Sequence, residues 1–210
     1  MTIPNTDKLC FESRPADERA AAIRARVLAQ KAGRSWEAQN AHLARAGYLA
    51  LKESEGLPRR IRRGLRSRAR LESIRFAVDD YDLLAGNPVF TADALPHRRG
   101  GTIPDADYDA MTDYLKRFGP EPGQTGHCEL DRTLVFKVGL GGLKAKLARQ
   151  AERFRGERRE TVQAFALALE GLIAMIGHAA EAVEAAIPAA RPARRLELEQ
   201  MARSCRRIQH

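Results

Sequence analysis

The sequence predicts a mostly α-helical protein with one or two short strands, and three observations support that prediction. Apolar residues recur at helical spacing through most of the 210 residues. Glycine and proline stand where these periodic segments begin and end. A single short stretch, residues 74–78, alternates side chains with the two-residue period of a strand. The composition, 44% hydrophobic and 30% charged, is typical of a globular domain rather than a disordered chain.

Two helices are predicted before residue 59. The first begins near Pro15, which suits an opening turn, and ends at Gly33. The second has Ser35 as its N-cap and ends before Gly56 and Pro58. Their apolar stripes are Ala20, Ile23 and Val27 in the first helix, and Trp36, Leu43, Gly47 and Leu51 in the second.

The segment from Arg59 to Arg70 is the densest run of charge, with seven arginines in twelve residues. Ile61, Leu65 and Ala69 recur every four residues within it, which predicts a helix with one apolar seam and a basic face. Such a face could neutralise phosphates. It lacks interleaved aromatic residues and lies in no known nucleic-acid-binding motif, so a solvated helix face is the favoured interpretation.

The middle of the chain is irregular. Ile74, Phe76 and Val78 predict a short strand, and residues 85–88 have turn chemistry. Residues 90–123 are rich in proline, glycine and aspartate, and we expect one short helix there, over about residues 105–118. A connection of this length is usually functional or flexible.

Three helices are predicted in the last third, over residues 133–156, 160–187 and 192–208. Gly139 and Gly142 are expected to allow close helix packing. Glu170 and His178 interrupt the most apolar helix and are expected to be satisfied polar groups at the edge of the core. The expected inward residues are Phe136, Leu140, Leu143, Leu147 and Phe154, then Val162, Phe165, Leu169, Ile173, Ile176, Ala180 and Val183, then Leu196, Met201 and Cys205.

Charge and cysteine content limit the partners, the metal or disulfide sites and the cellular location that we expect for the protein. The net charge of +9 could attract anionic partners but does not specify a fold. Cys10, Cys128 and Cys205 form no ligand cluster, so neither a disulfide framework nor a structural zinc site is predicted. No signal peptide is visible, and the apolar run over residues 164–177 is interrupted and shorter than the ~20 residues of a membrane span. A cytoplasmic location without membrane contact is therefore expected.

Four segments resemble, in order, the N-terminal part of the glycyl radical enzymes of the pyruvate formate-lyase type. Residues 18–58 are similar to the opening helix pair of that family, and residues 74–88, IRFAVDDYDLLAGNP, to its IxxDDELIVGN stretch. Residues 125–143, TGHCELDRTLVFKVGLGGL, are similar to its GHxxPDYxxVLxxGLxGL stretch. Residues 161–207 resemble its closing helical pair.

This resemblance implies a helical portion of a ten-stranded β/α barrel. In the family, a glycyl radical generates a thiyl radical on a cysteine, which then attacks a small-molecule substrate. A separate S-adenosylmethionine iron–sulfur activase installs the radical. The reactions include those of lyases, dehydratases, decarboxylases and formate acetyltransferases, in anaerobic and cytoplasmic settings, and the resemblance also admits a homodimer.

The 210 residues contain neither a Gly-Cys-x-Glu finger loop nor an Arg-Val-x-Gly-Tyr glycyl loop. We therefore expect an N-terminal fragment, with the barrel core and the glycyl radical domain missing, that binds no cofactor and is inactive alone. Its expected parts are a helical segment 1–73, a loop-rich segment 74–132 and a helical segment 133–210.

His127 is the leading candidate site residue. The resemblance implies that a histidine in this motif contacts a substrate hydroxyl or carboxylate, and its near-neutral pKa suits that task. Asp131 is a weaker substrate-binding candidate, since a carboxylate before the helix at Thr133 is stabilised by the helix dipole alone. Cys128 adjoins His127, but sequence neighbours rarely aim their side chains at each other, so a small buried side chain is expected there.

Two other functions remain open. One is a basic helical protein that binds nucleic acid or another anionic partner, although nucleic acid is not the favoured partner. The other is an accessory subunit that docks onto a separate barrel chain.

Overall fold

The structure is a computed structural model that describes residues 13–32, 35–89, 105–119 and 133–209. It is mostly α-helical with one small sheet of two strands, which confirms the predicted fold class. The elements are α1 (Ala16–Ala32), α2 (Ser35–Glu53), α3 (Arg59–Glu72), β1 (Arg75–Ala77), β2 (Asn87–Val89), α4 (Asp105–Phe118), α5 (Thr133–Arg153), α6 (Gly156–Ala186) and α7 (Pro192–Gln209).

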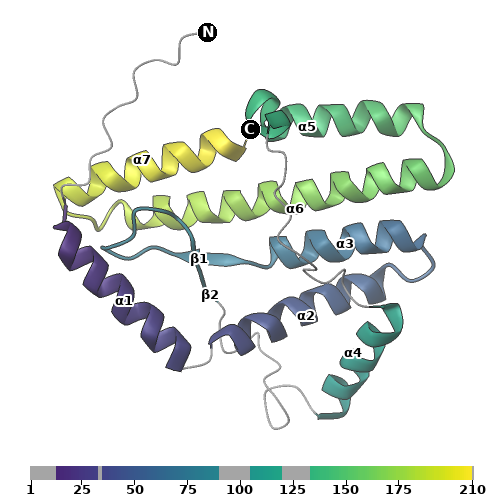
Figure 1. Cartoon of the computed structure of the whole chain (residues 1–210), viewed down its shortest axis with the longest axis horizontal. Helices are drawn as coiled ribbons and strands as arrows, with labels where there is room; N and C mark the ends of the chain where they lie inside the picture. The colour runs from purple at the N-terminus through teal and green to yellow at the C-terminus, as the bar shows by residue number, and fades with distance from the viewer. Residues whose placement is uncertain (1–12, 33–34, 90–104, 120–132, 210) are drawn as a thin grey trace.

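Helix α6 is the central element. It has 31 residues and contacts α3, α5, α7 and β1. In Figure 1 it runs lengthwise between α3 on one side and α5 and α7 on the other. By length and composition alone, α6 is apolar enough to cross a membrane, a test that core helices of globular proteins also pass. It contacts α3 on one side and α5 and α7 on the other, and 22% of its most apolar stretch is buried.

Helices α3 and α6 approach closely at two glycines, and this is the most extensive contact between two helices of the structure. A Cβ atom added to Gly64 of α3 would lie 2.7 Å from the Ala164 Cα atom of α6. One added to Gly171 of α6 would lie 2.8 Å from the Arg68 Cα atom of α3. The two backbones can therefore lie this close only because neither glycine has a side chain. The contact sets the position of the arginine-rich helix.

The predicted strand at residues 74–78 forms β1, and its partner β2 was not predicted. The two strands pair antiparallel, with Phe76 opposite Pro88. The turn chemistry of residues 85–88 concealed β2, because Asn87 and Pro88 are poor strand formers. A proline is tolerated here because each strand of a two-stranded sheet has a free edge.

The core lies where α6, α7 and the segment around the β strands meet. Val183 of α6 packs there with Leu198, Met201 and Ala202 of α7. Leu51 of α2 and Met111 of α4 are also buried, outside this core cluster. Of the residues expected to face inward, Val162, Ala180, Val183, Leu140 and Met201 are buried.

Several expected inward residues are exposed, and α1 is the clearest case. Ala20, Ile23 and Val27 all face solvent, whereas Arg19 is only 5% exposed. Among the described elements, helix α1 makes only a small contact with α2, and ion pairs of its arginines hold it to α7 and to Asp82, so its buried face is polar. Phe165 of α6 and Leu196 of α7 are also more than half exposed.

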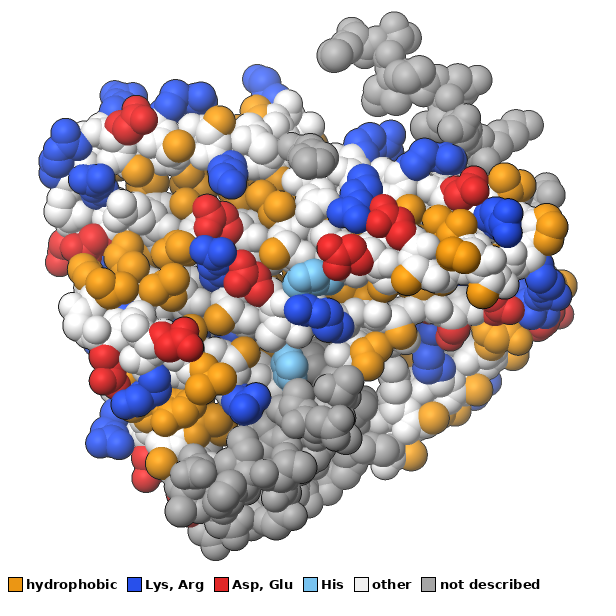
Figure 2. All heavy atoms as spheres, turned by 180° about the vertical axis from the view of Figure 1, so that it is seen from behind, with side chains coloured by type: hydrophobic (Ala, Val, Ile, Leu, Met, Phe, Trp, Pro, Cys, Tyr) orange, Lys and Arg blue, Asp and Glu red, His pale blue; other side chains and the backbone are white. Residues whose placement is uncertain are grey.

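Helix α5 is broken at Gly139, which has φ 67° and ψ −179°. This glycine was expected to allow close helix packing, and the structure shows another role for it, because it supplies a positive φ that other residues rarely adopt. The break turns the first part of the helix away from the rest. Phe136 is therefore 84% exposed, although Leu140, the next residue of its predicted face, is buried. Figure 2 shows further hydrophobic side chains exposed at the surface, among charged ones, on the face seen from behind.

Candidate functional site

The site residues predicted from the sequence, His127 and Asp131, lie outside the described residues, as do Cys10 and Cys128. The structure describes the two helices that flank this segment, which are α4, ending at Phe118, and α5, beginning at Thr133. The roles of His127 and Asp131 therefore stay predictions. Two other groups of polar residues are well described, and both involve arginine.

The arginines of α3 do not form the solvated face that the sequence favoured. Most of them are partly buried, because α3 lies between α2 and α6. Two of them pair with carboxylates of α6. The Arg60 Nη2 atom lies 3.0 Å from Glu157 Oε2, and the Arg68 Nη1 atom lies 3.1 Å from Glu170 Oε2. Part of the basic face is thus neutralised within the protein.

Two other arginines at the start of α3, Arg59 and Arg62, line an open pocket of about 560 Å³, which we call the cationic pocket. It lies where the C-terminal ends of α2 and α4 meet the N-terminal end of α3. Four side chains of its lining are cationic, two are aromatic and one is aliphatic. They are Lys52, Arg59, Arg62, Arg117, Tyr114, Phe118 and Leu57.

Backbone carbonyl groups and aromatic rings hold the two α3 arginines in place. Arg59 donates a hydrogen bond of 2.7 Å from Nη2 to the carbonyl oxygen of Phe118. Arg62 donates from Nη2 to the carbonyl oxygen of Leu51 at 2.8 Å and to the Tyr114 hydroxyl oxygen at 2.5 Å. Both guanidinium groups also lie over the Phe118 ring, with the Arg62 Cζ atom 4.9 Å from its centroid. Cation–π attraction adds to these hydrogen bonds.

A single ion pair lies at the rim of the cationic pocket. Lys52 donates from Nζ to Glu55 Oε1 at 2.8 Å and lies 5.1 Å above the Tyr114 ring. The hydrogen bond from Lys52, followed by one from Tyr114, lowers the pKa of the Glu55 carboxyl. Among the described residues, no carboxylate pairs with Arg59, Arg62 or Arg117.

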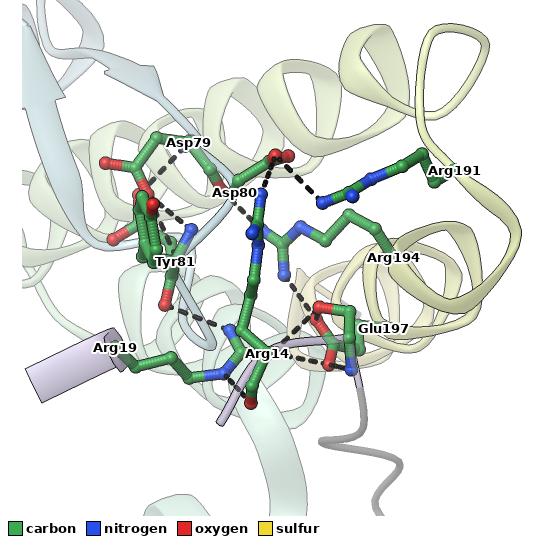
Figure 3. Close-up of polar contacts among 10 residues, drawn as sticks. Arg14, Arg19, Asp79, Asp80, Tyr81, Arg191, Arg194 and Glu197 are labelled. Carbon is green, nitrogen blue, oxygen red and sulfur yellow. Dashed lines mark hydrogen bonds and ion pairs between the residues drawn. The ribbon is translucent and has the colours of Figure 1, made fainter. Parts of the chain in front are cut away.

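A second group of arginines is buried with carboxylates at the other end of the molecule, and we call it the arginine–carboxylate cluster (Figure 3). Glu197 of α7 lies at its centre and is 2% exposed. Its Oε1 atom accepts a bond of 2.6 Å from Arg19 Nη2 of α1, and its Oε2 atom accepts one of 2.7 Å from Arg194 Nη1. Ser13 donates to both carboxylate oxygens, from its backbone and its hydroxyl group.

Electrostatics favour the ionised form of Glu197. Burial alone would raise the pKa of this carboxyl, but the hydrogen bonds from Ser13, Arg194 and Arg19 outweigh that effect and lower its pKa to about 2. A buried carboxylate with two arginine partners and further donors is a fully paired group rather than a reactive one.

The aspartates of residues 79–82 form a second link between the cluster and α1. Arg26 of α1 donates to Asp79 Oδ2 and to Asp82 Oδ1, both at 2.6 Å. Asp82 is 5% exposed and also accepts a hydrogen bond from the backbone N–H group of Asp79. Arg194 donates to the Asp79 carbonyl oxygen, and Arg14 pairs with Asp80. These aspartates therefore join α1 to α7, and their role is structural.

The other polar residues that the sequence singled out have local partners. Glu170 pairs with Arg68, and His178 Nδ1 lies 3.1 Å from the Ile74 carbonyl oxygen, which confirms that both are satisfied polar groups. Burial raises the pKa of the Cys205 thiol. Within the described ranges, no group of three or more His, Cys, Asp or Glu residues is placed to hold a metal ion.

Sequence reasoning did not find the cationic pocket. Its residues come from three helices, and nothing in the spacing of Lys52, Arg62 and Tyr114 shows that they converge. The arginine run itself is plain in the sequence. Which of its arginines form ion pairs and which line the pocket depends on other parts of the chain, namely the carboxylates of α6 and the ends of α2 and α4.

Comparison with known families places part of the chain in one of them. The model of the family described as pyruvate formate lyase-like matches residues 100–210, which is more than half of the chain. The matched region contains α4 to α7 and the segment with His127. It does not reach residues 18–58 or 74–88, whose likeness to the family stays a prediction. No curated protein and no solved structure matches the chain.

Proposed function

The chain belongs to the pyruvate formate lyase-like family, and from that premise we propose that it forms the helical N-terminal part of a glycyl radical enzyme. The observation that supports this most directly is the family match, which includes the segment with Gly126 and His127. The reaction we propose for the complete enzyme is that of a lyase, dehydratase, decarboxylase or formate acetyltransferase. The cysteine and glycine that carry its radicals lie outside these 210 residues.

In this proposal His127 positions the substrate. A neutral imidazole can accept a hydrogen bond from a substrate hydroxyl group, and an imidazolium can donate one to a carboxylate. Asp131 is assigned a smaller role, as a carboxylate near the positive end of α5. The radical itself is installed by an S-adenosylmethionine iron–sulfur activase, which would be the protein partner of the complete enzyme, in an anaerobic cytoplasm.

Exposed apolar side chains support a role as part of a larger assembly. Leu84 is 81% exposed, Phe136 is 84% exposed and Phe165 is 62% exposed. Side chains of this size are costly to leave in water, so surfaces that carry them commonly contact another domain, chain or copy. A barrel that covers α5 and α6 would bury Phe136 and Phe165 together.

The alternative of a basic nucleic-acid-binding protein gains less support. It needs a continuous basic face on α3, but Arg60 and Arg68 already pair with carboxylates of α6. Arg59 and Arg62 are anchored at the ends of α2 and α4. With Arg60 and Arg68 paired, and Arg59 and Arg62 turned toward helix ends, the run is not the continuous basic track that a phosphate backbone follows.

The proposal is tested first on the chain alone. The purified 210-residue protein is treated anaerobically with a glycyl radical activase and S-adenosylmethionine, and electron spin resonance is recorded. We expect no glycyl radical and no turnover. A glycyl radical on this chain alone would contradict the assignment of both radical residues to other parts of the enzyme.

The second arm uses the enzyme that contains this chain together with both radical loops. His127→Ala there should lower kcat by about 10²–10⁴, the usual contribution of a positioned acid or base, without reducing the glycyl radical signal. Asp131→Asn, the matched variant in the same segment, should change kcat much less. Full activity of the His127→Ala enzyme would remove His127 from the site.

A further inference from the structure

We propose that the cationic pocket binds a small organic phosphate, meaning a phosphate group attached to a flat or apolar body. This inference goes beyond the proposed function and does not depend on it. The pocket is built from α2, α3 and the C-terminal end of α4, and none of its residues is among those we assign to the radical enzyme's substrate.

The first argument is unbalanced charge. Lys52, Arg59, Arg62 and Arg117 contribute four positive charges, and Glu55 supplies one negative charge through its pair with Lys52. The C-terminal ends of α2 and α4 add roughly half a negative charge each, and the N-terminal end of α3 adds about half a positive charge. Between about two and three positive charges remain, enough to balance a phosphate monoester near neutral pH.

The second argument is that the guanidinium groups are already positioned. Each is held by a helix C-terminal carbonyl group and by the Phe118 ring, so little side-chain freedom is lost when an anion binds. A guanidinium group has five N–H donors, and Arg59 uses one of its nitrogens, Nη2, in the bond to Phe118. Its remaining planar donors suit phosphate oxygens better than an ammonium group does.

Gly119 helps to place Arg59. It ends α4 with φ +106°, and a Cβ atom added there would lie 2.9 Å from the Arg59 Nη2 atom. The N–H group of Gly119 donates to the carbonyl oxygens of Leu115 and Lys116, which leaves the Phe118 carbonyl oxygen for Arg59. The end of α4 is thus shaped around the guanidinium group.

The third argument concerns the size and lining of the pocket. A volume of about 560 Å³ is within the usual range for small-molecule sites. Leu57 is 48% exposed and, with the rings of Tyr114 and Phe118, provides an apolar wall beside the cations. A phosphate with an organic body would use both surfaces. A nucleic acid needs a continuous track, which the pairing of Arg60 and Arg68 with α6 interrupts.

The test uses phenyl phosphate as the probe, titrated into the full 210-residue chain at low ionic strength and followed by calorimetry. We expect one binding site, competition by inorganic phosphate, and much weaker binding of phenol. Arg59→Gln combined with Arg117→Gln should weaken binding about tenfold or more, since each removes a charge-assisted hydrogen-bond donor. Both residues are exposed, and helix content measured by circular dichroism checks that the variant folds.

Arg63→Gln is the matched control, because Arg63 is an exposed arginine of the same turn of α3 that does not line the pocket. Its affinity for phenyl phosphate should fall no more than about threefold, because its guanidinium group does not line the pocket and acts on the probe only through solvent. Equal loss in the control would overturn the proposal, and so would an absence of binding at millimolar probe.

Two further arms use a short DNA duplex and vesicles containing anionic lipid. Either one binding more tightly than phenyl phosphate, with loss in the Arg59→Gln and Arg117→Gln variant, would reassign the pocket to a polyanion or a membrane surface and overturn the proposal. Weaker binding of both the duplex and the vesicles than of phenyl phosphate supports a soluble phosphate ester.

Discussion

The arginine–carboxylate cluster and the cationic pocket use the same side chain in opposite electrostatic settings. In the cluster, Arg19 and Arg194 are almost fully buried, and both bind Glu197. In the pocket, Arg59 and Arg62 are held by carbonyl groups and a ring, and no described carboxylate pairs with them. The first arrangement is electrically balanced and closed, whereas the second is positive and open to solvent.

The difference indicates which region stabilises the fold and which can bind a ligand. A buried ion pair repays its desolvation only when every group has partners, and Glu197 meets that condition with two arginines and Ser13. An exposed arginine stays hydrated without a carboxylate partner, so its guanidinium group can remain open to a ligand at little cost in stability. Four predictions test this division, in order of expected size.

The largest effect is expected from Glu197→Gln. The amide cannot neutralise Arg19 and Arg194, so two buried charges lose their partner, and the free energy of unfolding should fall by about 3–5 kcal/mol. Urea unfolding followed by circular dichroism measures it.

Glu184→Gln is the control for that variant. Glu184 also accepts bonds from an arginine, Arg206, but both side chains are about 40% exposed. Its loss should cost less than about 1 kcal/mol. Similar losses in both variants would show that burial does not distinguish the cluster.

The second prediction concerns acid. The pKa of Glu197 is about 2 in the folded chain against an ordinary value of 4.5, so its carboxylate is protonated at a lower pH in the folded state than in the unfolded state. This group therefore stabilises the fold fully above pH 4.5, and its contribution of about 2–4 kcal/mol is lost as the pH falls toward 2. Stability measured from pH 6 to pH 3 should fall less steeply in Glu197→Gln than in the parent. Parallel curves would contradict the lowered pKa.

The third prediction tests the contact that positions α3, on which the pocket depends. Gly64→Ala forces a methyl group against the Ala164 backbone of α6, so we expect a loss of about 1–3 kcal/mol in unfolding free energy. Gly86→Ala is the control, because an added Cβ there meets nothing within 4 Å. An unchanged stability of Gly64→Ala would mean that α3 and α6 can separate without cost.

The smallest effect is expected from Glu55→Gln. Glu55 is exposed and supplies the carboxylate at the rim of the pocket, so its removal should barely move the unfolding midpoint. The pocket becomes more positive, and phenyl phosphate should bind roughly two- to fivefold more tightly. Glu53→Gln, which changes an exposed carboxylate at the end of α2, two residues before Glu55, should change the affinity less. Weaker binding in Glu55→Gln would make Glu55 part of the site.

The helices were largely predictable, because their limits depend on local chemistry. The predicted helix over residues 105–118 matches α4, and the helix predicted at Arg59 begins there as α3. Proline fixes φ and lacks a backbone N–H group, and glycine adopts the positive φ that ends many helices, so both often mark such boundaries without help from distant residues. The strand β2 was missed because its pairing with β1, rather than its own composition, makes it a strand.

Which face of a helix is buried was less predictable. The stripe of Ala20, Ile23 and Val27 is exposed, because α1 is anchored through Arg19 and Arg26 instead. Phe136 left its predicted face because Gly139 breaks α5. Periodicity describes one helix, whereas burial depends on which neighbours that helix meets.

Local residue chemistry was therefore enough to establish the mostly helical class, the helix limits and the family motif around His127, since each depends on neighbours along the chain. The division of the arginines into a buried cluster and an open pocket depends on tertiary structure, which brings α1 and α7 together at the cluster and α2, α3 and α4 together at the pocket. An arginine is structural or available according to whether a carboxylate lies within hydrogen-bonding distance, and only folding brings such distant residues together.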